Sequence, residues 1–213
     1  MKGAAIFLVH NRGMAGFTVH TGTQVVYAAD HVDTDRIIPA RFLSRVSRVG
    51  FGELLFADVR GPEFPLDQPD AAGASVLTVG TNFGCGSSRE HAVWAIQQAG
   101  LKAVIARIDV ETPGYSDIFR QNAANCGLLL VELAPADHQA LVAAGTGAEV
   151  TINLPDQEVV CGGQTYQFEI NPAVKAQLIA GHDLIGTTLV HADAIAAYEE
   201  SGRLWSPPAG ANV

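Results

Sequence analysis

The sequence predicts an α/β fold, a mixed sheet with flanking helices, and two observations carry this prediction. Through the middle of the chain, over residues 74–145, short apolar segments of strand length alternate with longer helical segments. Strands that are separated by helices pair in parallel, because each connection must cross over the sheet before the next strand begins. The flanking segments instead alternate with a period of two and are joined by turn residues, which predicts hairpins there.

Each element has its own local signal. The strand segments are rich in β-branched residues and end at glycine, proline or polar turns. Ser116 or Asp117 is placed to cap a helix that Gly127 ends, and Gly100 is placed to end the helix before it. We expect strands within residues 17–28, 74–80, 101–106, 128–133 and 149–170, and helices within residues 87–99, 115–127, 135–145, 171–181 and 191–200.

Composition and charge limit the possible partners. The chain has 213 residues, of which 48% are hydrophobic, and a formal net charge of -9. Its negative field repels nucleic-acid phosphates and acidic membrane surfaces, so we expect neither nucleic acid nor membrane as a partner. We expect one domain over residues 17–213, after an N-terminal extension at residues 1–16. The apolar run of this extension, Ile6 to Val9, is too short for a signal-peptide core.

The cysteines indicate a reduced protein without a metal site of its own. Cys85, Cys126 and Cys161 are an odd number, and no two of them form a CxxC motif. Neither a disulfide framework nor a complete zinc or iron–sulfur site follows from such a set. We therefore expect no metal and no cofactor bound by this chain, and a cytoplasmic location.

One loop concentrates the reactive side chains. Residues 82–96 read NFGCGSSREHAVWAI, in which two glycines flank a cysteine and polar residues precede an apolar helical run. Gly84 and Gly86 let the chain turn sharply after the preceding strand. The first turn of a helix offers unpaired N–H groups and the positive end of the helix dipole to an anion. The dinucleotide motif is incomplete, because Arg89 stands where its third glycine would be.

The same residues also allow a purely structural interpretation. Ser87 and Glu90 have the spacing of a capping box, in which the serine caps the helix and the glutamate reaches back to it. That interpretation accounts for two residues, but not for Arg89 or for the second serine. On the residues alone, an anion-binding site and a plain capped helix are equally open.

Five segments together carry a resemblance to a known family. GCGSSREHAVWAI resembles the signature of the small subunits of 3-isopropylmalate dehydratase, in the aconitase superfamily. Four more segments resemble their counterparts in the same order: VDTDRIIPARFL, RVGFGELLF, SDIFRQN and DAIAAYE. The resemblance covers about residues 17–200 and implies the swivelling β/β/α domain of the aconitases, here as a separate chain.

The resemblance also implies a reaction and a partner. A large dehydratase subunit is expected to hold a four-iron–four-sulfur cluster through three cysteines, with one open iron that binds the substrate hydroxyl as a Lewis acid. The substrate would be a small hydroxy dicarboxylate. The enzyme would remove water from 2-isopropylmalate and add it back in the other orientation, which gives 3-isopropylmalate for leucine synthesis.

Two residues match the catalytic positions of the family. Ser87 matches the serine whose alkoxide takes the carbon-bound proton, and Asp35 matches an aspartate that faces the same site. A serine hydroxyl is too weak an acid to ionise unaided. The helix N-terminus and Arg89 are the sources of stabilisation that this sequence offers. Without the resemblance, Asp35 would be interpreted as part of an Asx turn.

Four residues are candidates for binding the substrate. Ser88 and Arg89 match substrate-binding residues, and a guanidinium can hold a carboxylate through two N–H groups. Arg48 and Arg45 lie in the segment that aligns with the part of the family that recognises the variable end of the substrate. Both of these arginines are equally well interpreted as solvated surface charges.

Two alternatives stay open. Related hydro-lyases that act on citraconate, dimethylmaleate or homoaconitate share GSSRE, and only the segment after Pro39 distinguishes them. A lone anion-binding α/β module would bind its ligand as an isolated chain, whereas the dehydratase subunit would have almost no activity alone. Residues 107–116 look longer than the corresponding connection of the family, a departure that does not touch residues 85–89, which we call the serine loop.

Overall fold

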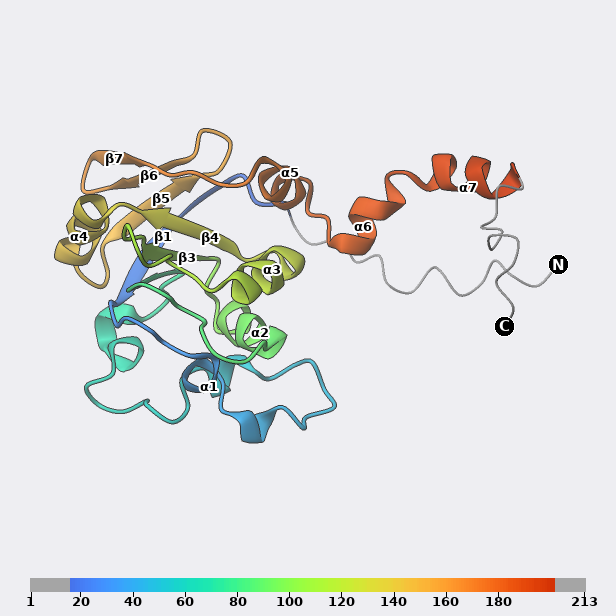
Figure 1. The fold of residues 1–213 in the computed structure, drawn as a ribbon. Coiled ribbons are helices and arrows are strands. Elements are labelled where there is room, and N and C mark those ends of the chain that lie inside the picture. Colours follow the sequence, from blue (N-terminus) through green and yellow to red (C-terminus); the bar gives the residue numbers. More distant parts are fainter. Residues whose placement is uncertain (1–15, 202–213) are drawn as a thin grey trace.

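A seven-stranded sheet forms the body of the molecule in this computed structural model, which describes residues 16–201 (Figure 1). The predicted extension at residues 1–16 therefore lies, apart from Gly16, outside the described residues. The strand order is β4-β3-β2-β1-β5-β6-β7. The strands are β1 (Val19–Tyr27), β2 (Val76–Val79), β3 (Ala103–Arg107), β4 (Leu129–Leu133), β5 (Glu149–Asn153), β6 (Glu158–Cys161) and β7 (Gln164–Gln167).

The sheet has a parallel half and an antiparallel half that share β1. Strands β1, β2, β3 and β4 pair in parallel, each with the next. Beyond the other edge of β1, strands β5, β6 and β7 pair antiparallel. The predicted mixed sheet is confirmed, and so are the parallel pairing of the strand–helix repeats in the middle of the chain and the hairpins after them. The hairpin predicted for the N-terminal flank is wrong, because Val19–Tyr27 is one strand that pairs with β2 and β5.

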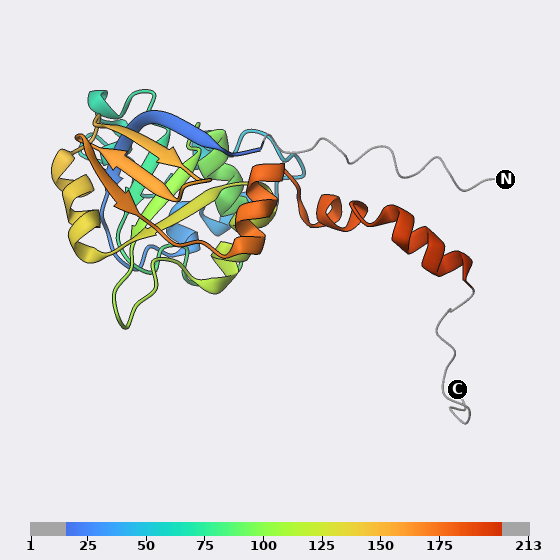
Figure 2. The same cartoon turned by 90° about the horizontal axis from the view of Figure 1, so that it is seen from above.

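The first five helices lie around the sheet, and the apolar side chains of the sheet belong to two cores (Figures 1 and 2). Successive side chains of a strand point to opposite faces, so Leu77 and Val104 belong to one core while Val76 and Ile105 belong to the other. The helices are α1 (Thr34–Ile37), α2 (Glu90–Gln98), α3 (Asp117–Cys126), α4 (Pro135–Ala144), α5 (Pro172–Ala180), α6 (Leu184–Leu189) and α7 (Ala192–Glu200).

The predicted helix ends at Gly100 and Gly127 are confirmed. Gly127 has φ 77° in the left-handed region and Gly100 has φ 96°, which glycine adopts without the cost of a Cβ. At the other end of α3 the cap is Ser116, whose Oγ accepts a hydrogen bond from the N–H of Phe119 at 3.3 Å. Of the two predicted caps, Ser116 is therefore correct, and Asp117 is the first helical residue.

The connection from β1 to β2 is long and built from short turns. After α1 it contains four 3₁₀ turns: η1 (Ala40–Phe42), η2 (Gly52–Leu54), η3 (Pro65–Asp67) and η4 (Pro69–Ala71). Phe51 and Phe56 of this connection are fully buried, and both belong to the core that also contains Leu77 and Val104. The connection is therefore anchored to the body by aromatic side chains rather than by a long element.

The last two helices, α6 and α7, differ from the others in their position and burial. α6 and α7 extend away from the body in both views (Figures 1 and 2), and neither has a buried residue. None of the helices within residues 16–201 is long and apolar enough to span a membrane.

Candidate functional site

Three chain segments meet beyond the carboxyl ends of the parallel strands. Residues 32–34 follow β1, residues 83–85 follow β2, and residues 114–116 follow β3. The N–H of Gly84 donates to the carbonyl of Val32 at 2.8 Å, and that of Phe83 donates to the carbonyl of Gly114 at 2.9 Å. The three segments thus continue the order of their strands, at the edge where α/β sheets bind ligands.

Gly84 is required where it stands. It has φ 74°, and a Cβ added there would lie 2.3 Å from Cγ of Phe119, a fully packed side chain of α3. The Oγ of Ser116 also donates to the carbonyl of Gly84 at 2.6 Å. The predicted sharp turn is therefore present, and it presses the loop directly onto the start of α3.

The predicted capping box at the start of α2 is wrong. The helix begins at Glu90, and its N-cap is Arg89, with extended backbone and no side-chain cap. Ser87 lies before the helix, and its carbonyl accepts a hydrogen bond from Oγ1 of Thr34 at 2.8 Å. This contact from α1 and the turn at Gly86, with φ 87°, hold residues 86–88 outside the helix. Ser87 is therefore not the N-cap of α2, which was the structural role that its spacing from Glu90 had allowed.

Arg89 joins this loop to α1. Its Nη1 lies 2.7 Å from Oδ1 of Asp35 and 3.4 Å from Oγ1 of Thr34. The Arg89 side chain is only 12% exposed, whereas that of Asp35 is 54% exposed. Within the described residues, Nε and Nη2 of Arg89 make no hydrogen bond, so one edge of the guanidinium fork is available to a ligand.

The two serines lie exposed beside this pair. The hydroxyl of Ser87 makes no hydrogen bond to any residue between 16 and 201, and the Oγ of Ser88 accepts one from Nδ2 of Asn122 at 3.3 Å. Asn122 is a site residue that the sequence interpretation missed, although it lies in the segment SDIFRQN that carried part of the resemblance. The structure therefore brings together Ser87, Ser88, Arg89 and Asp35, four of the six predicted site residues.

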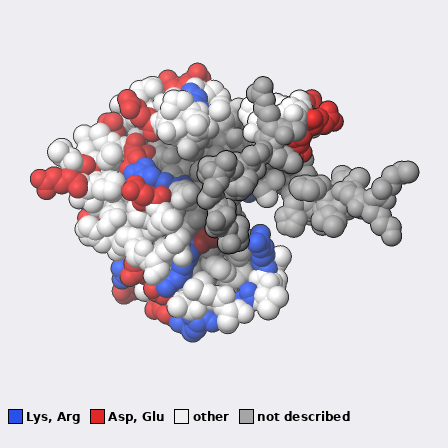
Figure 3. Space-filling view, turned by 45° about the vertical axis from the view of Figure 1, so that its right-hand side comes forward, with Lys and Arg blue, Asp and Glu red and all other residues white. Residues whose placement is uncertain are grey.

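Arg45 and Arg48 lie in an exposed part of the connection after α1, and neither makes a hydrogen bond or an ion pair with the serine loop within the described residues. The guanidinium of Arg48 lies 5.0 Å from the centre of the Trp94 ring on α2, and that of Arg45 lies 5.9 Å from the centre of the Phe42 ring. Both rest on aromatic faces, which holds them without neutralising them. Figure 3 shows basic side chains gathered on the lower part of one face, the level at which α1 lies in Figure 1.

Gln98, at the last turn of α2, holds this connection in place and was also missed. Its Oε1 accepts hydrogen bonds from the N–H groups of Gly50 and Phe51, both at 2.9 Å. Its Nε2 donates to the carbonyl of Arg48 at 2.8 Å. One side chain thus ties the backbone next to Arg48 to the helix that begins at the serine loop. A glutamine at the end of a helix gives no local signal of such a role.

The thiols are poor candidates for reactive groups or metal ligands. Burial raises the pKa of Cys126 to about 12, and its hydrogen bond to Glu90, with Sγ and Oε1 3.3 Å apart, adds to this effect. Burial and the nearby Asp33 carboxylate raise the pKa of Cys85. No group of three or more His, Cys, Asp or Glu residues that could hold a metal ion occurs in the part of the chain that the structure describes.

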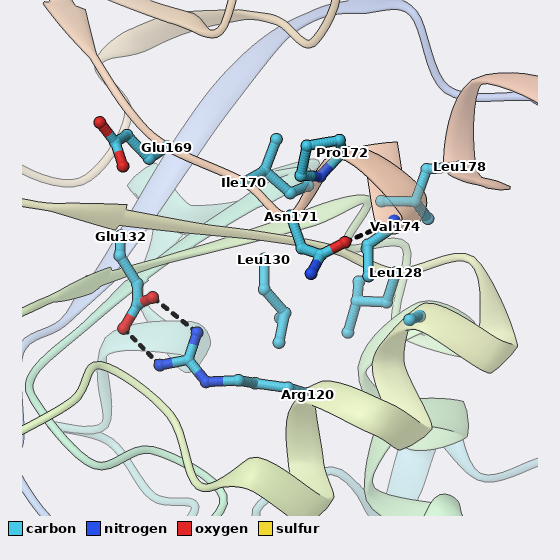
Figure 4. A pocket seen from close by; sticks show the side chains of 11 residues that line it. Arg120, Leu128, Leu130, Glu132, Glu169, Ile170, Asn171, Pro172, Val174 and Leu178 are labelled. Carbon is cyan, nitrogen blue, oxygen red and sulfur yellow. Dashed lines mark hydrogen bonds and ion pairs between the residues drawn. The ribbon is translucent and has the colours of Figure 1, made fainter. Parts of the chain in front are cut away.

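A pocket of about 400 Å³ lies elsewhere, between α3, β4 and the start of α5 (Figure 4). Leu130 and Val174 belong to its apolar wall. Arg120 and Glu132 close one end with two hydrogen bonds of 2.6 Å. Glu132 also accepts from the N–H of Gly114 at 2.6 Å, so this ion pair stabilises the connection after β3. None of the predicted site residues lines the pocket, and its one guanidinium is already paired.

Comparisons with known proteins decide the family. A family model described as the aconitase C-terminal domain matches residues 14–136, and one described as LeuD_N matches residues 139–172. The 3-isopropylmalate dehydratase small subunit of Acidothermus cellulolyticus is 46% identical over 198 residues, which are 91% of this chain and 98% of that protein. The chain belongs to the family of 3-isopropylmalate dehydratase small subunits.

Other members of this small-subunit family agree with the assignment. The small subunit from Listeria monocytogenes serotype 4a is 42% identical over 88% of this chain and 97% of its own length. A crystal structure of 3-isopropylmalate dehydratase (leuD) from Methanocaldococcus jannaschii matches with a TM-score of 0.63 and 30% identity, over 85% of this chain and 99% of that chain. The predicted family and its aconitase-type fold are thereby confirmed.

Proposed function

We propose that this chain supplies the proton-transferring and carboxylate-binding part of a dehydratase active site that a large subunit completes. As a member of its family, the chain is a subunit of a hydro-lyase, 3-isopropylmalate dehydratase, which serves leucine biosynthesis. The name small subunit implies a large partner. The observation that carries the site assignment is the exposed Ser87 hydroxyl, which has no hydrogen-bond partner among residues 16–201, next to the largely buried Arg89.

The proposed base is Ser87. Its position before α2 supports this role, because the N–H groups of Glu90 and His91 have no carbonyl partner within the described residues. They form the positive end of a helix of nine residues, which favours a negative oxygen nearby. The Arg89 guanidinium lies beside the same loop, and the Asp35 carboxylate offsets only part of its charge. Once its own hydroxyl proton has passed to water, the Ser87 alkoxide can take the carbon-bound proton of the substrate.

We propose that the Nε and Nη2 edge of the Arg89 guanidinium binds a carboxylate of the substrate. Asp35 occupies Nη1, and this contact fixes the orientation of the guanidinium before the substrate arrives. Nε and Nη2 then face a substrate carboxylate as a preset pair of donors, with the Ser88 hydroxyl as a further donor. A net charge of -9 opposes the approach of a dianion, so the site needs this local cation.

The remaining half of the reaction needs groups that residues 16–201 do not offer. Loss of the substrate hydroxyl needs an electrophile, and the thiols Cys85 and Cys126 are held in their protonated forms and lie in no metal-binding group among residues 16–201. We assign that role to a four-iron–four-sulfur cluster on the large subunit. Arg48 and Arg45 are proposed to meet the variable end of the substrate, and a cytoplasmic location fits the free cysteines.

Anaerobic reconstitution with the cognate large subunit tests the proposal. We expect the isolated chain to bind no stoichiometric iron and to be inactive, and the mixture to convert 2-isopropylmalate. A panel of hydroxy diacids and unsaturated diacids then separates this substrate from citraconate, dimethylmaleate and homoaconitate. An iron–sulfur spectrum in the isolated chain would contradict the assignment of the cluster to the large subunit. Tight binding of a small anion by the isolated chain, without any complex, would favour a lone anion-binding module.

A further inference from the structure

The C-terminal helices expose an unusual amount of apolar surface. We call residues 183–200, with α6 and α7, the arm. Half of the large apolar side chains that are exposed in the described part of the chain lie on this arm: Leu184, Ile185, Leu189, Val190, Ile195 and Tyr198. Their exposed fractions run from 40% for Ile195 to 64% for Val190. Concentrations of this kind on a soluble protein mark interaction surfaces.

The arm is nevertheless built as regular structure. Asp183 caps α6, since its Oδ1 accepts a hydrogen bond from the N–H of Gly186 at 2.6 Å. On α7, Ile195 and Tyr198 stand three residues apart and share a face, while Asp193 and Glu200 stand seven apart and share the opposite one. Short isolated helices are marginal in water, so a capped α6 followed by an amphipathic α7 indicates a partner that they pack against.

Charge indicates what kind of partner this is. Residues 176–201 carry four acidic residues, Asp183, Asp193, Glu199 and Glu200, and no lysine or arginine. The whole chain has a net charge of -9, so a second copy would be repelled by the arm. The charge therefore favours a different chain, with an apolar groove bordered by basic side chains.

The position of the arm connects it to the proposed active site. The arm continues from α5, and Nε2 of Gln177 on α5 donates to the carbonyl of Ala124 on α3 at 3.0 Å. The same helix α3 contacts the serine loop through Asn122 and Ser88. α3 thus links the helix that precedes the arm to the loop that a large subunit must reach to complete the site.

We propose that the arm is a docking element that binds an apolar, basic-rimmed groove on the large subunit. This inference rests on the proposed function, because the partner it names is the subunit that completes the dehydratase. The arm would tether the two chains through a surface separate from the Ser87 loop. Assembly would then not depend on substrate contacts alone.

The test compares two double variants of the same short helix. Ile185→Ser with Leu189→Ser removes two apolar side chains, whereas Thr187→Ala with Thr188→Ala is the matched control. The threonine hydroxyls donate only to backbone carbonyls within the arm, those of Asp183 and Leu184, so the control retains both the helix and its apolar face. Binding to the purified large subunit is measured by titration, and the melting temperature of each free chain is recorded.

We expect the serine variant to bind about tenfold more weakly or worse, as for the loss of buried interface anchors. The control and the wild type should bind equally. All three free chains should have the same melting temperature, because no residue of α6 is buried. Changing Asp193, Glu199 and Glu200 to Asn and Gln should weaken binding at low salt and reduce its dependence on salt.

The possible outcomes separate the arm from the function. If the wild type forms an active complex and the serine variant binds equally well, the arm proposal is overturned while the function stands. If the wild type forms no complex, the proposed function fails, and the arm proposal fails with it.

A free chain that is dimeric only when Ile185 and Leu189 are intact would show that the arm binds a second copy of this chain. A lowered melting temperature of the free serine variant would show that the arm packs on its own chain. Both of these results contradict the proposal.

Discussion

The serine loop and the arm are both exposed, but they are exposed in different ways. The loop at residues 85–89 is held from several sides: Thr34 of α1 bonds to Ser87, Asn122 of α3 bonds to Ser88, and Asp35 bonds to Arg89. The arm has no buried residue. What the loop exposes is a small set of oriented polar groups, whereas the arm exposes a large apolar area.

This difference between the loop and the arm shows that an exposed residue can serve either catalysis or binding to a partner. A polar group acts on a substrate only if its neighbours fix its position, because a small displacement of a reacting group costs much of the rate. An interface helix needs no such support before its partner arrives, since the partner itself buries the apolar face. We therefore expect changes in the loop to affect turnover without assembly, and changes in the arm to affect assembly without stability.

Ser87→Ala should have the largest effect. If Ser87 is the base, the assembled complex should lose about 10²-fold or more in kcat, the usual contribution of a positioned base. The melting temperature should not change, because Arg89 and not Ser87 occupies the N-cap of α2. Ser44→Ala, an exposed serine outside the loop, is the control. Turnover by Ser87→Ala near the wild-type rate would show that Ser87 is not the base, and the proposed difference between the loop and the arm would then be wrong.

Arg89→Lys should come next, although it retains the charge. Lysine cannot hold Asp35 and also present two parallel donors to a carboxylate, so kcat/KM should fall about 10- to 100-fold, the equivalent of ~1.5–3 kcal/mol for a charged hydrogen bond. Binding to the large subunit should be unaffected. The control is Arg60→Lys, which alters another arginine–carboxylate pair, with Asp67, away from the loop. An unchanged kcat/KM would mean that Arg89 serves only to hold Asp35.

Gln98→Leu should have the smallest effect on the kinetics of the three variants. It tests whether an exposed substrate-binding residue must be held in place by its neighbours. It removes the three hydrogen bonds that hold residues 48–51 to α2 and leaves the buried Phe51 and the contact of Arg48 with Trp94 to hold this part of the connection. We expect KM to rise about 3- to 10-fold with little change in kcat, since each such bond contributes ~1 kcal/mol. Gln97→Leu loses one bond to the carbonyl of Cys126 instead and is the control. Equal KM values for both variants would show that the position of Arg48 does not matter to the substrate.

Local sequence determined much of this protein. The repeat of strand and helix segments predicted the parallel strands in the middle, because each helix must cross over the sheet. The period-two alternation predicted the hairpins after them, because it reports which face of a strand is buried. Glycine marked the ends of α2 and α3, since a left-handed residue is needed there. The order of five motifs was enough to predict the family, and four of the six predicted site residues do meet in space.

The tertiary structure alone decided how these residues are held. Ser87 and Glu90 have the spacing of a capping box, yet the contact of Thr34 with Ser87, across 53 positions of the chain, belongs to a loop that stays outside the helix. Gln98 meets Gly50 across 48 positions, and Asn122 meets Ser88 across 34. Such contacts depend on how α1, α2 and α3 pack over the sheet. No local pattern encodes that packing, because the free energy that selects it comes from burying side chains from distant parts of the chain together.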